Sequence, residues 1–448
     1  MKQAISLLTA SVLLVACAAF AAGCRNKAAA AGDKLVVISP HNNDIKKEFE
    51  AAFGKFYKDK TGRQVDIEWR DVGGGSNQIL TYIVNAYSGG SSPGVDIIWG
   101  GGDQNFQRLA DLKLLAPLKL PKDVTDNVPQ ELGGVQLYDA TGNWVGTCLS
   151  AFGFLYNKEL LSRRGIAPPQ TWDDLGGPQF YDMITLADPT LSGSAAVAYE
   201  MVVQSGKDWP DGWARLMAIM GNTKKFYPSA SEAAKAPETG EAAIAACIDF
   251  YGETRVAALP DKLVFVRPKN QTAFTPDPIA ILRDPPHPEL AQGFVDFVMS
   301  DQGQCLWALK PGSPGGPANK ELGRQPIRKD FYWLHKGQML NWIVNPYELS
   351  AGMKLDSQMK QSRGDVLNLL VRTAAIDNRD GIKKARKKII DSNFDKSLVD
   401  EFNRLPDNVN TREKVLQVVA QLADKAQADT IATDWTKFFR DKYEAIAK

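Results

Sequence analysis

The sequence predicts an α/β fold in which strands of parallel sheets alternate with covering helices, and three observations lead to this class. Short runs rich in β-branched residues, "LVVI" (35–38), "VDIEW" (65–69) and "VDIIW" (95–99), recur at intervals of about thirty residues, the length of a strand–helix–strand unit. Between these runs, apolar residues recur with the period of an amphipathic helix. A glycine-rich or polar loop follows each run. This alternation is typical of a doubly wound α/β domain.

The two predicted helices between these strands have recognisable beginnings. Asn42 or Asn43 is a natural N-cap for the helix "NNDIKKEFEAAFGKFY", and Ser76 for the helix "SNQILTYIVNAY". The loops "SPHNN", "DVGGGSN" and "WGGGDQN" lie between strand ends and helix starts. In open parallel sheets, ligands bind outside the carboxyl ends of strands, near helix N-termini. We therefore expect all three loops to face one crevice.

The α/β domain described so far is predicted to be the first of two lobes, and the chain passes from it into a second lobe and then returns. The apolar run "TCLSAFGFLYN" (147–157) suits a strand that crosses between lobes, and the amphipathic run "GWARLMAIM" (212–220) indicates a helix of the second lobe. "PDPIAIL" reads as a return strand, followed by a helix from about Pro288. We predict a first lobe of residues 34–147 and 273–345, a second lobe of residues 148–272, and a mostly helical C-terminal region of residues 346–448.

The composition is that of an ordinary globular protein. The 448-residue chain is 44% hydrophobic and 23% charged, and it is long enough for two lobes with separate cores. Its 53 Lys and Arg residues balance 52 Asp and Glu residues, so the net charge of +1 creates no long-range field for nucleic acid. We therefore expect no nucleic-acid partner, and any anion must be bound by a local site.

The first 24 residues resemble the signal peptide of a bacterial lipoprotein. Lys2 supplies a positive charge, residues 4–23 carry none, and small residues precede Cys24. A second candidate lipobox ends at Cys17, and we favour Cys24 because the polar tether 25–33 follows it. The alternative is an uncleaved anchor helix, since about 20 apolar residues span a bilayer. We expect a lipid anchor on the outer side of the cytoplasmic membrane, in the periplasm.

Three cysteines remain beyond the signal: Cys148, Cys247 and Cys305. In an oxidising compartment, three thiols form at most one disulfide. The sequence contains no C-x-x-C pair and no Cys/His spacing of a zinc site. We therefore predict no cofactor, and spacing indicates no metal site.

Several linked motifs in order along the chain resemble a known family. They are "GVDIIWGGG", "GFLYNKELLSRRGIAPPQTWDDL", "ITLADPTLSGSAA", "ETGEAAIA" and "HPELAQGFVDFVMSDQGQ". Together they are similar to the extracellular solute-binding proteins of ABC transporters, in the branch that contains ferric-ion-, phosphonate- and sugar-phosphate-binding receptors. The resemblance covers about residues 34–317. It implies a type II periplasmic binding protein fold, closure of two lobes about a hinge, and delivery of a ligand to a membrane permease. We expect a monomer.

Ser192, Gly193 and Ser194 are the most informative candidate ligand-binding residues. They stand ahead of a small-residue run that reads as a helix start. The hydroxyls can simply cap that helix. Alternatively, they and the free N–H groups bind an anion, which the glycine allows to approach the backbone. The family resemblance favours the second reading, with a phosphate, phosphonate or carboxylate group as the ligand.

Further candidates come from the other loops and from aromatic residues. The alternative readings are a capping or surface role for His41, a flexible turn for Gly75 and Ser76, and core packing for the aromatic residues Trp99, Tyr227 and Tyr251. An aromatic and polar mixture also suits a sugar moiety. These additional predicted ligand-binding residues are Ser39, His41, Asn42, Gly75, Ser76, Trp99, Gly100, Ser150, Tyr227 and Tyr251.

Iron is the alternative ligand that the resemblance implies. Ferric receptors of this family use two adjacent tyrosines after a "GE" helix and an early histidine. Here the matching pair is Phe250 and Tyr251, so one phenolate is missing. The alternative ferric ligand set is His41, Tyr227 and Tyr251.

An exported enzyme on the same fold is the second alternative. The sequence contains no G-x-S-x-G, no H-E-x-x-H and no P-loop. Its three histidines, at 41, 287 and 335, leave little general-base chemistry. We predict ligand binding without turnover.

Overall fold

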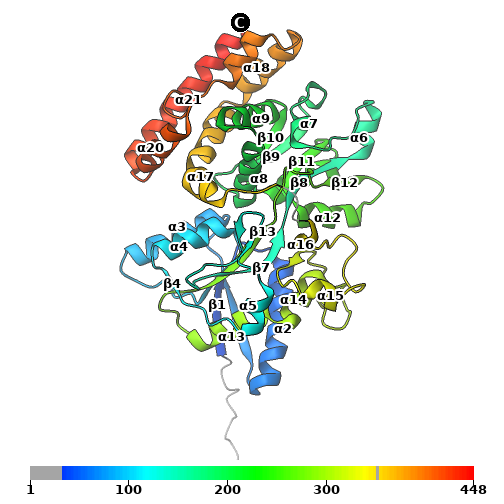
Figure 1. Cartoon of the computed structure of the whole chain (residues 1–448), viewed down its shortest axis with the longest axis vertical. Coiled ribbons are helices and arrows are strands. Elements are labelled where there is room, and N and C mark those ends of the chain that lie inside the picture. Colours follow the sequence, from blue (N-terminus) through cyan, green and yellow to red (C-terminus); the bar gives the residue numbers. More distant parts are fainter. Residues whose placement is uncertain (1–32, 350–352) are drawn as a thin grey trace, which may run out of the picture.

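The computed structural model describes residues 33–349 and 353–448. The predicted signal peptide, with Cys24 and Cys17, lies outside the described residues. Figure 1 shows two α/β lobes stacked along the long axis, with the C-terminal helices packed against the second lobe and most of them on its outer side. In the described ranges, no helix has the length and hydrophobicity of a transmembrane segment.

The first lobe is built on a seven-stranded mixed sheet. Its strand order is β14-β7-β13-β3-β1-β2, with β4 paired to β13. β1 is parallel to β2 and β3, as the repeat of the sequence predicts, whereas the return strand β13 is antiparallel to β3 and β7. The strands are β1 (Asp33–Ile38), β2 (Val65–Arg70), β3 (Ile97–Trp99), β4 (Leu115–Ala116), β7 (Val145–Ser150), β13 (Thr275–Leu282) and β14 (Gln325–Pro326).

Helices cover both faces of this sheet. Asn42 is the N-cap of α2 and accepts a hydrogen bond from the Ile45 N–H (3.0 Å). In α3, the N-cap is Gly75, so Ser76 is the first helical residue and not the predicted cap. The helices of the first lobe are α2 (Asn43–Thr61), α3 (Ser76–Ser88), α4 (Asp103–Asp111), α5 (Lys122–Asn127), α13 (Pro288–Met299), α14 (Asp301–Ala308), α15 (Phe331–Leu334) and α16 (Pro346–Leu349).

The chain crosses to the second lobe at Ala151. The run predicted as one crossing strand is broken there into β7, which belongs to the first sheet, and β8 (Phe152–Asn157), which belongs to the second. Ala151 is fully buried, and its N–H donates to a carboxylate oxygen of Asp249 (3.0 Å), whose own N–H donates back to the Ala151 carbonyl (2.9 Å). This reciprocal pair holds the crossover in a defined position.

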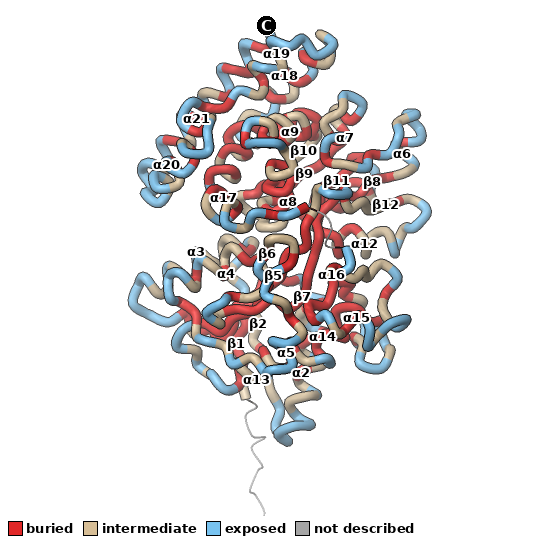
Figure 2. Tube along the Cα trace, viewed as in Figure 1, coloured by how far each residue is buried: buried red, intermediate tan, exposed pale blue. Residues whose placement is uncertain are grey.

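The second lobe contains a five-stranded sheet of order β10-β9-β11-β8-β12. β9 is parallel to β10 and β11, and β8 is antiparallel to β11 and β12. Figure 2 shows buried residues running through the strands of both lobes. A separate hairpin is formed by β5 (Glu131–Leu132) and β6 (Val135–Gln136). The other elements of the second lobe are β9 (Ile184–Ala187), β10 (Thr223–Tyr227), β11 (Ile244–Ile248), β12 (Leu263–Val266), α6 (Lys158–Arg163), α7 (Trp172–Leu175), a 3-10 turn (Pro178–Phe180), α8 (Gly193–Gln204), α9 (Trp209–Gly221), α10 (Ala230–Ala233), α11 (Ala236–Thr239) and α12 (Asp249–Ala258).

The C-terminal helices extend the core of the second lobe. Their buried side chains pack in the same apolar cluster as α8 and α9. The Trp213 and Phe439 ring centroids are 6.1 Å apart, and the Trp209 indole N–H donates to the Val409 carbonyl (2.8 Å). These elements are α17 (Ser357–Val371), a π-helical turn (Arg372–Ile376), α18 (Arg379–Asp391), α19 (Lys396–Asn403), α20 (Arg412–Leu422) and α21 (Lys425–Ala447).

Helix α17 forms buried ion pairs with both lobes. The Lys360 ammonium lies 2.6 and 2.8 Å from the two carboxylate oxygens of Asp103, at the start of α4 in the first lobe. One turn along the same helix, Arg363 pairs with Glu200 of α8 in the second lobe (2.7 Å). All four side chains are buried. The C-terminal region is therefore a bridge between the lobes as well as an extension of one of them.

Cys148, Cys247 and Cys305 are buried and unpaired. They lie in three different apolar clusters. Disulfide formation among them therefore plays no part in holding this structure together.

The Lys360–Asp103 pair generates a stability prediction. We expect Lys360→Met to lower the free energy of unfolding by about 3 to 5 kcal/mol, because it leaves the buried Asp103 carboxylate without its counter-charge. Lys396→Met is the matched control, since Lys396 pairs with Asp400 at the surface and should cost about 0.5 kcal/mol or less. Urea unfolding of both variants measures the difference. Equal costs would show that Asp103 does not depend on Lys360.

Candidate functional site

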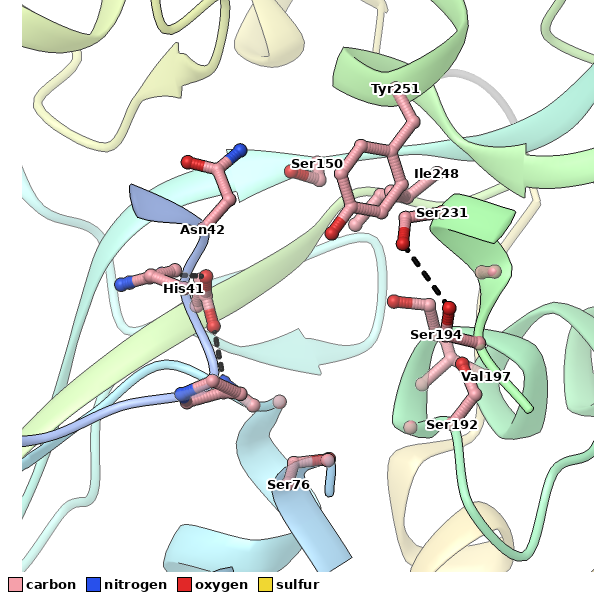
Figure 3. A pocket seen from close by; sticks show the side chains of 18 of the residues that line it. His41, Asn42, Ser76, Ser150, Ser192, Ser194, Val197, Ser231, Ile248 and Tyr251 are labelled. Atoms are coloured by element: carbon pink, nitrogen blue, oxygen red, sulfur yellow. Dashed lines mark hydrogen bonds and ion pairs between the residues drawn. The ribbon is translucent and has the colours of Figure 1, made fainter. Parts of the chain in front are cut away.

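A cleft of about 450 Å³ lies between the lobes. The first lobe contributes the β1–α2 and β2–α3 loops, part of β13 and Arg324. The second lobe contributes the loop before α8, the start of α10 and the start of α12. Figure 3 shows the side chains of both lobes directed toward the same space. The predicted residues that line it are His41, Asn42, Gly75, Ser76, Ser150, Ser192, Gly193, Ser194 and Tyr251.

The N-termini of α3 and α8, one from each lobe, open onto this cleft. Ser192 is the N-cap of α8, and its hydroxyl accepts a hydrogen bond from the Ala195 N–H (3.4 Å). Among the described residues, the Ser76 and Ser194 hydroxyls have no hydrogen-bond partner. Unpaired N–H groups and the positive end of the helix dipole attract anions. Two such ends with free hydroxyls therefore form an environment suited to a negatively charged group.

The two lobes touch beside these helix ends. A side-chain carbon on Gly75 would lie 2.6 Å from the Leu191 carbonyl oxygen, and one on Gly193 would lie 2.8 Å from the Ser76 hydroxyl. The Asn77 amide donates to the Thr190 carbonyl across the same gap (3.4 Å). At Gly75 only glycine allows this approach, because a side-chain carbon would clash with a backbone oxygen, whereas at Gly193 the Ser76 hydroxyl would have to rotate away. The two lobes are therefore in direct contact beside the cleft, and we refer to this contact as the closed arrangement.

A buried polar cluster forms the first-lobe wall of the cleft. The Asp277 carboxylate accepts hydrogen bonds from the Gly101 N–H (2.7 Å) and His41 Nε2 (2.8 Å), and it forms an ion pair with Arg324. Arg324 also donates to the Ser150 hydroxyl (3.1 Å). The guanidinium therefore has fixed partners, and it holds residues from three separate parts of the chain together.

The cluster carries no net charge at neutral pH. Burial lowers the pKa of His41 below its usual value of 6.5, with smaller contributions from Arg324 and Lys46, and it outweighs the attraction of Asp277. Burial opposes ionisation of Asp277, but Arg324 and His41 outweigh that effect and hold the pKa of this carboxyl well below its usual range. A neutral His41 beside an Arg324–Asp277 ion pair adds no net charge to the cleft wall. Attraction for an anion must therefore come from the helix ends.

Aromatic residues of the second lobe complete the wall. The Arg324 guanidinium lies over the Phe250 ring, with its central carbon 4.5 Å from the ring centroid. Burial raises the pKa of Tyr251, so its phenol stays protonated and is a hydrogen-bond donor. Figure 3 shows this ring directed into the cleft near Ser231 and Ser194.

Sequence reasoning missed Asp277 and Arg324. They lie 236 and 283 residues from His41 along the chain, and no spacing connects them. One signal was available for Asp277, because an acidic residue within the apolar strand "PDPIAIL" is costly to bury without a partner. Arg324 follows a glycine in an irregular segment, which offers no such signal.

Four predicted residues do not line the cleft: Trp99, Gly100, Ser39 and Tyr227. The prediction for Trp99 is wrong. Its side chain is fully buried in the core of the first lobe, and its indole N–H donates to the Thr147 hydroxyl (3.1 Å). Gly100 packs against the His41 ring, where a side-chain carbon would lie 2.7 Å from Nε2. The Ser39 hydroxyl accepts a hydrogen bond from the His41 N–H (3.1 Å). These three residues lie behind His41 and position it.

Tyr227 is the fourth predicted residue that does not line the cleft. It lies on the edge strand β10, and its hydroxyl donates to a carboxylate oxygen of Glu241 (2.6 Å). Lys225 lies over its ring, 4.1 Å from the centroid. The Tyr227 side chain is therefore not part of the cleft lining, and the alternative ferric set of His41, Tyr227 and Tyr251 does not assemble there.

The fold and the cleft define a class of protein: a two-lobed ligand-binding protein with the type II periplasmic binding protein fold. The sequence model of the bacterial extracellular solute-binding proteins matches residues 92–341, and the chain belongs to this family.

Curated relatives share part of the sequence. The phosphoglycerate transport regulatory protein PgtC of Salmonella typhimurium is 26% identical over 215 residues, which are 48% of this chain and 51% of PgtC. The chain therefore spans about half the length of this relative. An uncharacterised protein of Haemophilus influenzae is 26% identical over 309 residues, which are 68% of this chain and 82% of that protein.

Solved structures share the fold. Iron-bound HitA from Pseudomonas aeruginosa is 21% identical with a TM-score of 0.56, covering 75% of this chain and 98% of its own. AfuA from Actinobacillus pleuropneumoniae, with bound fructose-6-phosphate, is 18% identical with a TM-score of 0.56, covering 74% and 97%. The periplasmic binding protein P5PA is 20% identical with a TM-score of 0.62, covering 77% and 99%. At these identities the likeness concerns the fold alone.

The buried His41 generates a pH prediction. Its pKa is below 6.5 in the folded protein, so below pH 6.5 the unfolded chain binds more protons than the folded one, and stability declines as the pH falls. The His41→Gln variant keeps an amide donor for Asp277 but does not titrate. Below pH 6.5, we expect the free energy of unfolding of the wild type to fall by up to about 1.4 kcal/mol per pH unit more than that of the variant. Urea unfolding between about pH 7.5 and 5.5 measures both slopes, and parallel slopes would contradict a buried neutral His41.

Proposed function

We propose that this chain is the substrate-binding component of an ABC importer. In this proposal it captures a small anionic solute, an organophosphate, phosphonate or carboxylate, in the cleft between its lobes and delivers it to a permease in the cytoplasmic membrane. One observation carries the anion assignment: α3 and α8 begin on opposite sides of the cleft, with the Ser76 and Ser194 hydroxyls free.

Closure explains how such a site gains affinity. When the lobes meet at Gly75 and Gly193, the ligand leaves bulk water. In this lower dielectric, hydrogen bonds from backbone N–H groups and serine hydroxyls to an anion become stronger. The permease then distinguishes the closed form from the open one, since only closure brings the two lobes into fixed relative positions.

The rest of the cleft favours an anion attached to an organic group. Its volume of about 450 Å³ is larger than an inorganic ion needs, and apolar side chains such as Phe152, Val197 and Ile248 share the lining with the polar ones. The name of PgtC refers to phosphoglycerate transport, and AfuA was solved with fructose-6-phosphate. Both support an organophosphate as the first compound to test.

The alternatives have less support. Iron remains the alternative because HitA was solved with iron, but Fe³⁺ needs several oxygen ligands and Tyr227 is held by Glu241 away from the cleft. For an enzyme, His41 Nε2 is hydrogen-bonded to Asp277, and among the described residues neither ring nitrogen of His41 is hydrogen-bonded to a hydroxyl or a thiol. We infer binding without turnover, by a monomer anchored outside the cytoplasmic membrane through Cys24 or Cys17.

A thermal-shift panel tests the ligand class. A compound that binds only the folded state raises its stability, by about 2.7 kcal/mol when its concentration is 100 times Kd. We expect phosphoglycerate, a sugar phosphate or a phosphonate to raise Tm, with inorganic chloride as the control. A rise with ferric citrate alone would overturn the assignment.

Two serine variants separate ligand binding from helix capping. We expect Ser194→Ala to weaken the compound that binds by about 5- to 150-fold, the equivalent of about 1 to 3 kcal/mol, without loss of stability. Ser192→Ala should weaken binding and, in addition, lower the free energy of unfolding by about 0.5 to 2 kcal/mol, since Ser192 caps α8. Thr411→Ala is the control, because Thr411 caps α20 outside the cleft and its loss should affect stability only. Unchanged affinity in Ser194→Ala would refute the proposed contact.

A glycine variant tests whether binding needs closure. Gly75→Ala places a carbon against the Leu191 carbonyl, so we expect it to keep the lobes apart and weaken binding by about 5- to 150-fold. In small-angle X-ray scattering with ligand, its radius of gyration should exceed that of the wild type. Gly54→Ala is the control, because no atom lies within 4 Å of its added carbon. Tight binding by a compact Gly75→Ala variant would show that the closed arrangement is not the binding form.

A further inference from the structure

Three side chains with metal-binding atoms meet in the first lobe, outside the cleft. Asp301 and Cys305 lie one turn apart on α14, and His335 follows α15. His335 Nε2 lies 2.8 Å from Asp301 Oδ1 and 3.6 Å from Cys305 Sγ, and Cys305 Sγ lies 4.0 Å from Asp301 Oδ2. None of the three lines the cleft between the lobes. We refer to them as the α14 cluster.

These distances are close to the edges of a metal tetrahedron. With metal bonds of about 2.0 to 2.1 Å to nitrogen, 2.3 Å to sulfur and 2.0 to 2.2 Å to oxygen, neighbouring ligand atoms in a tetrahedral site are about 3.3 to 3.6 Å apart. The Cys305–His335 separation of 3.6 Å falls within this range. The Asp301–His335 separation of 2.8 Å must widen and the Asp301–Cys305 separation of 4.0 Å must narrow, each by about half an ångström. The Asp301 side chain is 52% exposed and has room to make that movement.

The α14 cluster converges on one point instead of forming a chain. A proton relay from a thiol through histidine to a carboxylate requires the two partners at opposite nitrogens of the imidazole ring. Here Asp301 and Cys305 are both closest to Nε2, and Cys305 is 4.0 Å from Nδ1. Convergence of one oxygen, one sulfur and one nitrogen is the arrangement that a metal ion requires.

The surrounding residues hold two of the three side chains in place. The His335 ring stacks on Phe331, with centroids 4.5 Å apart, and the His335 N–H donates to the Phe331 carbonyl (3.0 Å). Cys305 is buried against Phe331 and its apolar neighbours. The exposed Asp301 leaves a route from solvent. The cluster therefore combines two ordered ligands with one movable ligand at the entrance.

We propose that the α14 cluster binds a Zn²⁺ ion through Asp301, Cys305 and His335, with water as the fourth ligand. Oxygen, thiolate and imidazole are all ligands of zinc in proteins, and a carboxylate with a thiolate balances its two positive charges. The thiol proton passes to solvent when the sulfur binds the metal. The ion would fix α14 to the segment after α15, which is a structural role distinct from binding of a transported solute.

Cobalt is the probe for this site, because a cobalt–thiolate bond gives a near-ultraviolet charge-transfer band and tetrahedral cobalt gives strong visible bands. The full chain is first treated with a chelator and then titrated with Co²⁺. We expect both bands to appear with one equivalent and to disappear when Zn²⁺ is added. In the chelated protein, Zn²⁺ should raise Tm. Absence of the bands would overturn the proposal.

Variants assign the ligands. Cys305→Ser should abolish the charge-transfer band, whereas the control Cys247→Ser, at a buried thiol of the second lobe, should retain it. Asp301→Asn changes an exposed side chain without altering its shape, so it should fold normally and weaken Zn²⁺ binding at least about tenfold. Retention of the band in Cys305→Ser, or unchanged affinity in Asp301→Asn, would show adventitious metal binding and refute the site. Neither result depends on which solute occupies the cleft.

Discussion

The close approach of the two lobes at Gly75 and Gly193 is the constraint on which the geometry of the cleft depends. At this contact, backbone and a serine hydroxyl occupy the space that side chains would fill elsewhere. The approach brings the N-termini of α3 and α8, one from each lobe, to opposite sides of the same cleft. Their N–H groups belong to different lobes, so a bound anion would bridge them and stabilise closure.

The other wall of the cleft depends on a balanced ion pair. Arg324 and Asp277 neutralise each other, and His41 stays uncharged because it is buried. A buried charge without a partner is expensive, which explains why the Asp277 carboxylate and the Arg324 guanidinium are paired with each other. The cluster therefore gives shape and hydrogen-bonding capacity, whereas the helix ends give the electrostatic preference. This division allows a site for anions in a chain with almost no net charge.

The C-terminal helices change how the lobes are connected. Within the described residues, α17 joins the lobes through Lys360–Asp103 and Arg363–Glu200, in addition to the crossover at Ala151. Opening of the cleft must therefore break or carry along a buried ion pair. The α14 cluster lies within the first lobe, so it acts on a different part of the molecule from the ion pairs of α17.

The strands at 35–38, 65–69 and 95–99, the cap at Asn42 and the helix start at Ser192 were predictable from the sequence alone, because periodicity and capping are local properties. The family motifs likewise indicated the two-lobed fold. Only the tertiary structure decided that Trp99 is core, that Tyr227 lies on an outer edge, and that Asp277 with Arg324 forms the cleft wall. The α14 cluster and the Lys360–Asp103 pair were also invisible in the sequence. Each of these features depends on a contact between residues separated along the chain, such as His335 with Asp301 or Lys360 with Asp103, and its energy depends on burial, which no local pattern encodes.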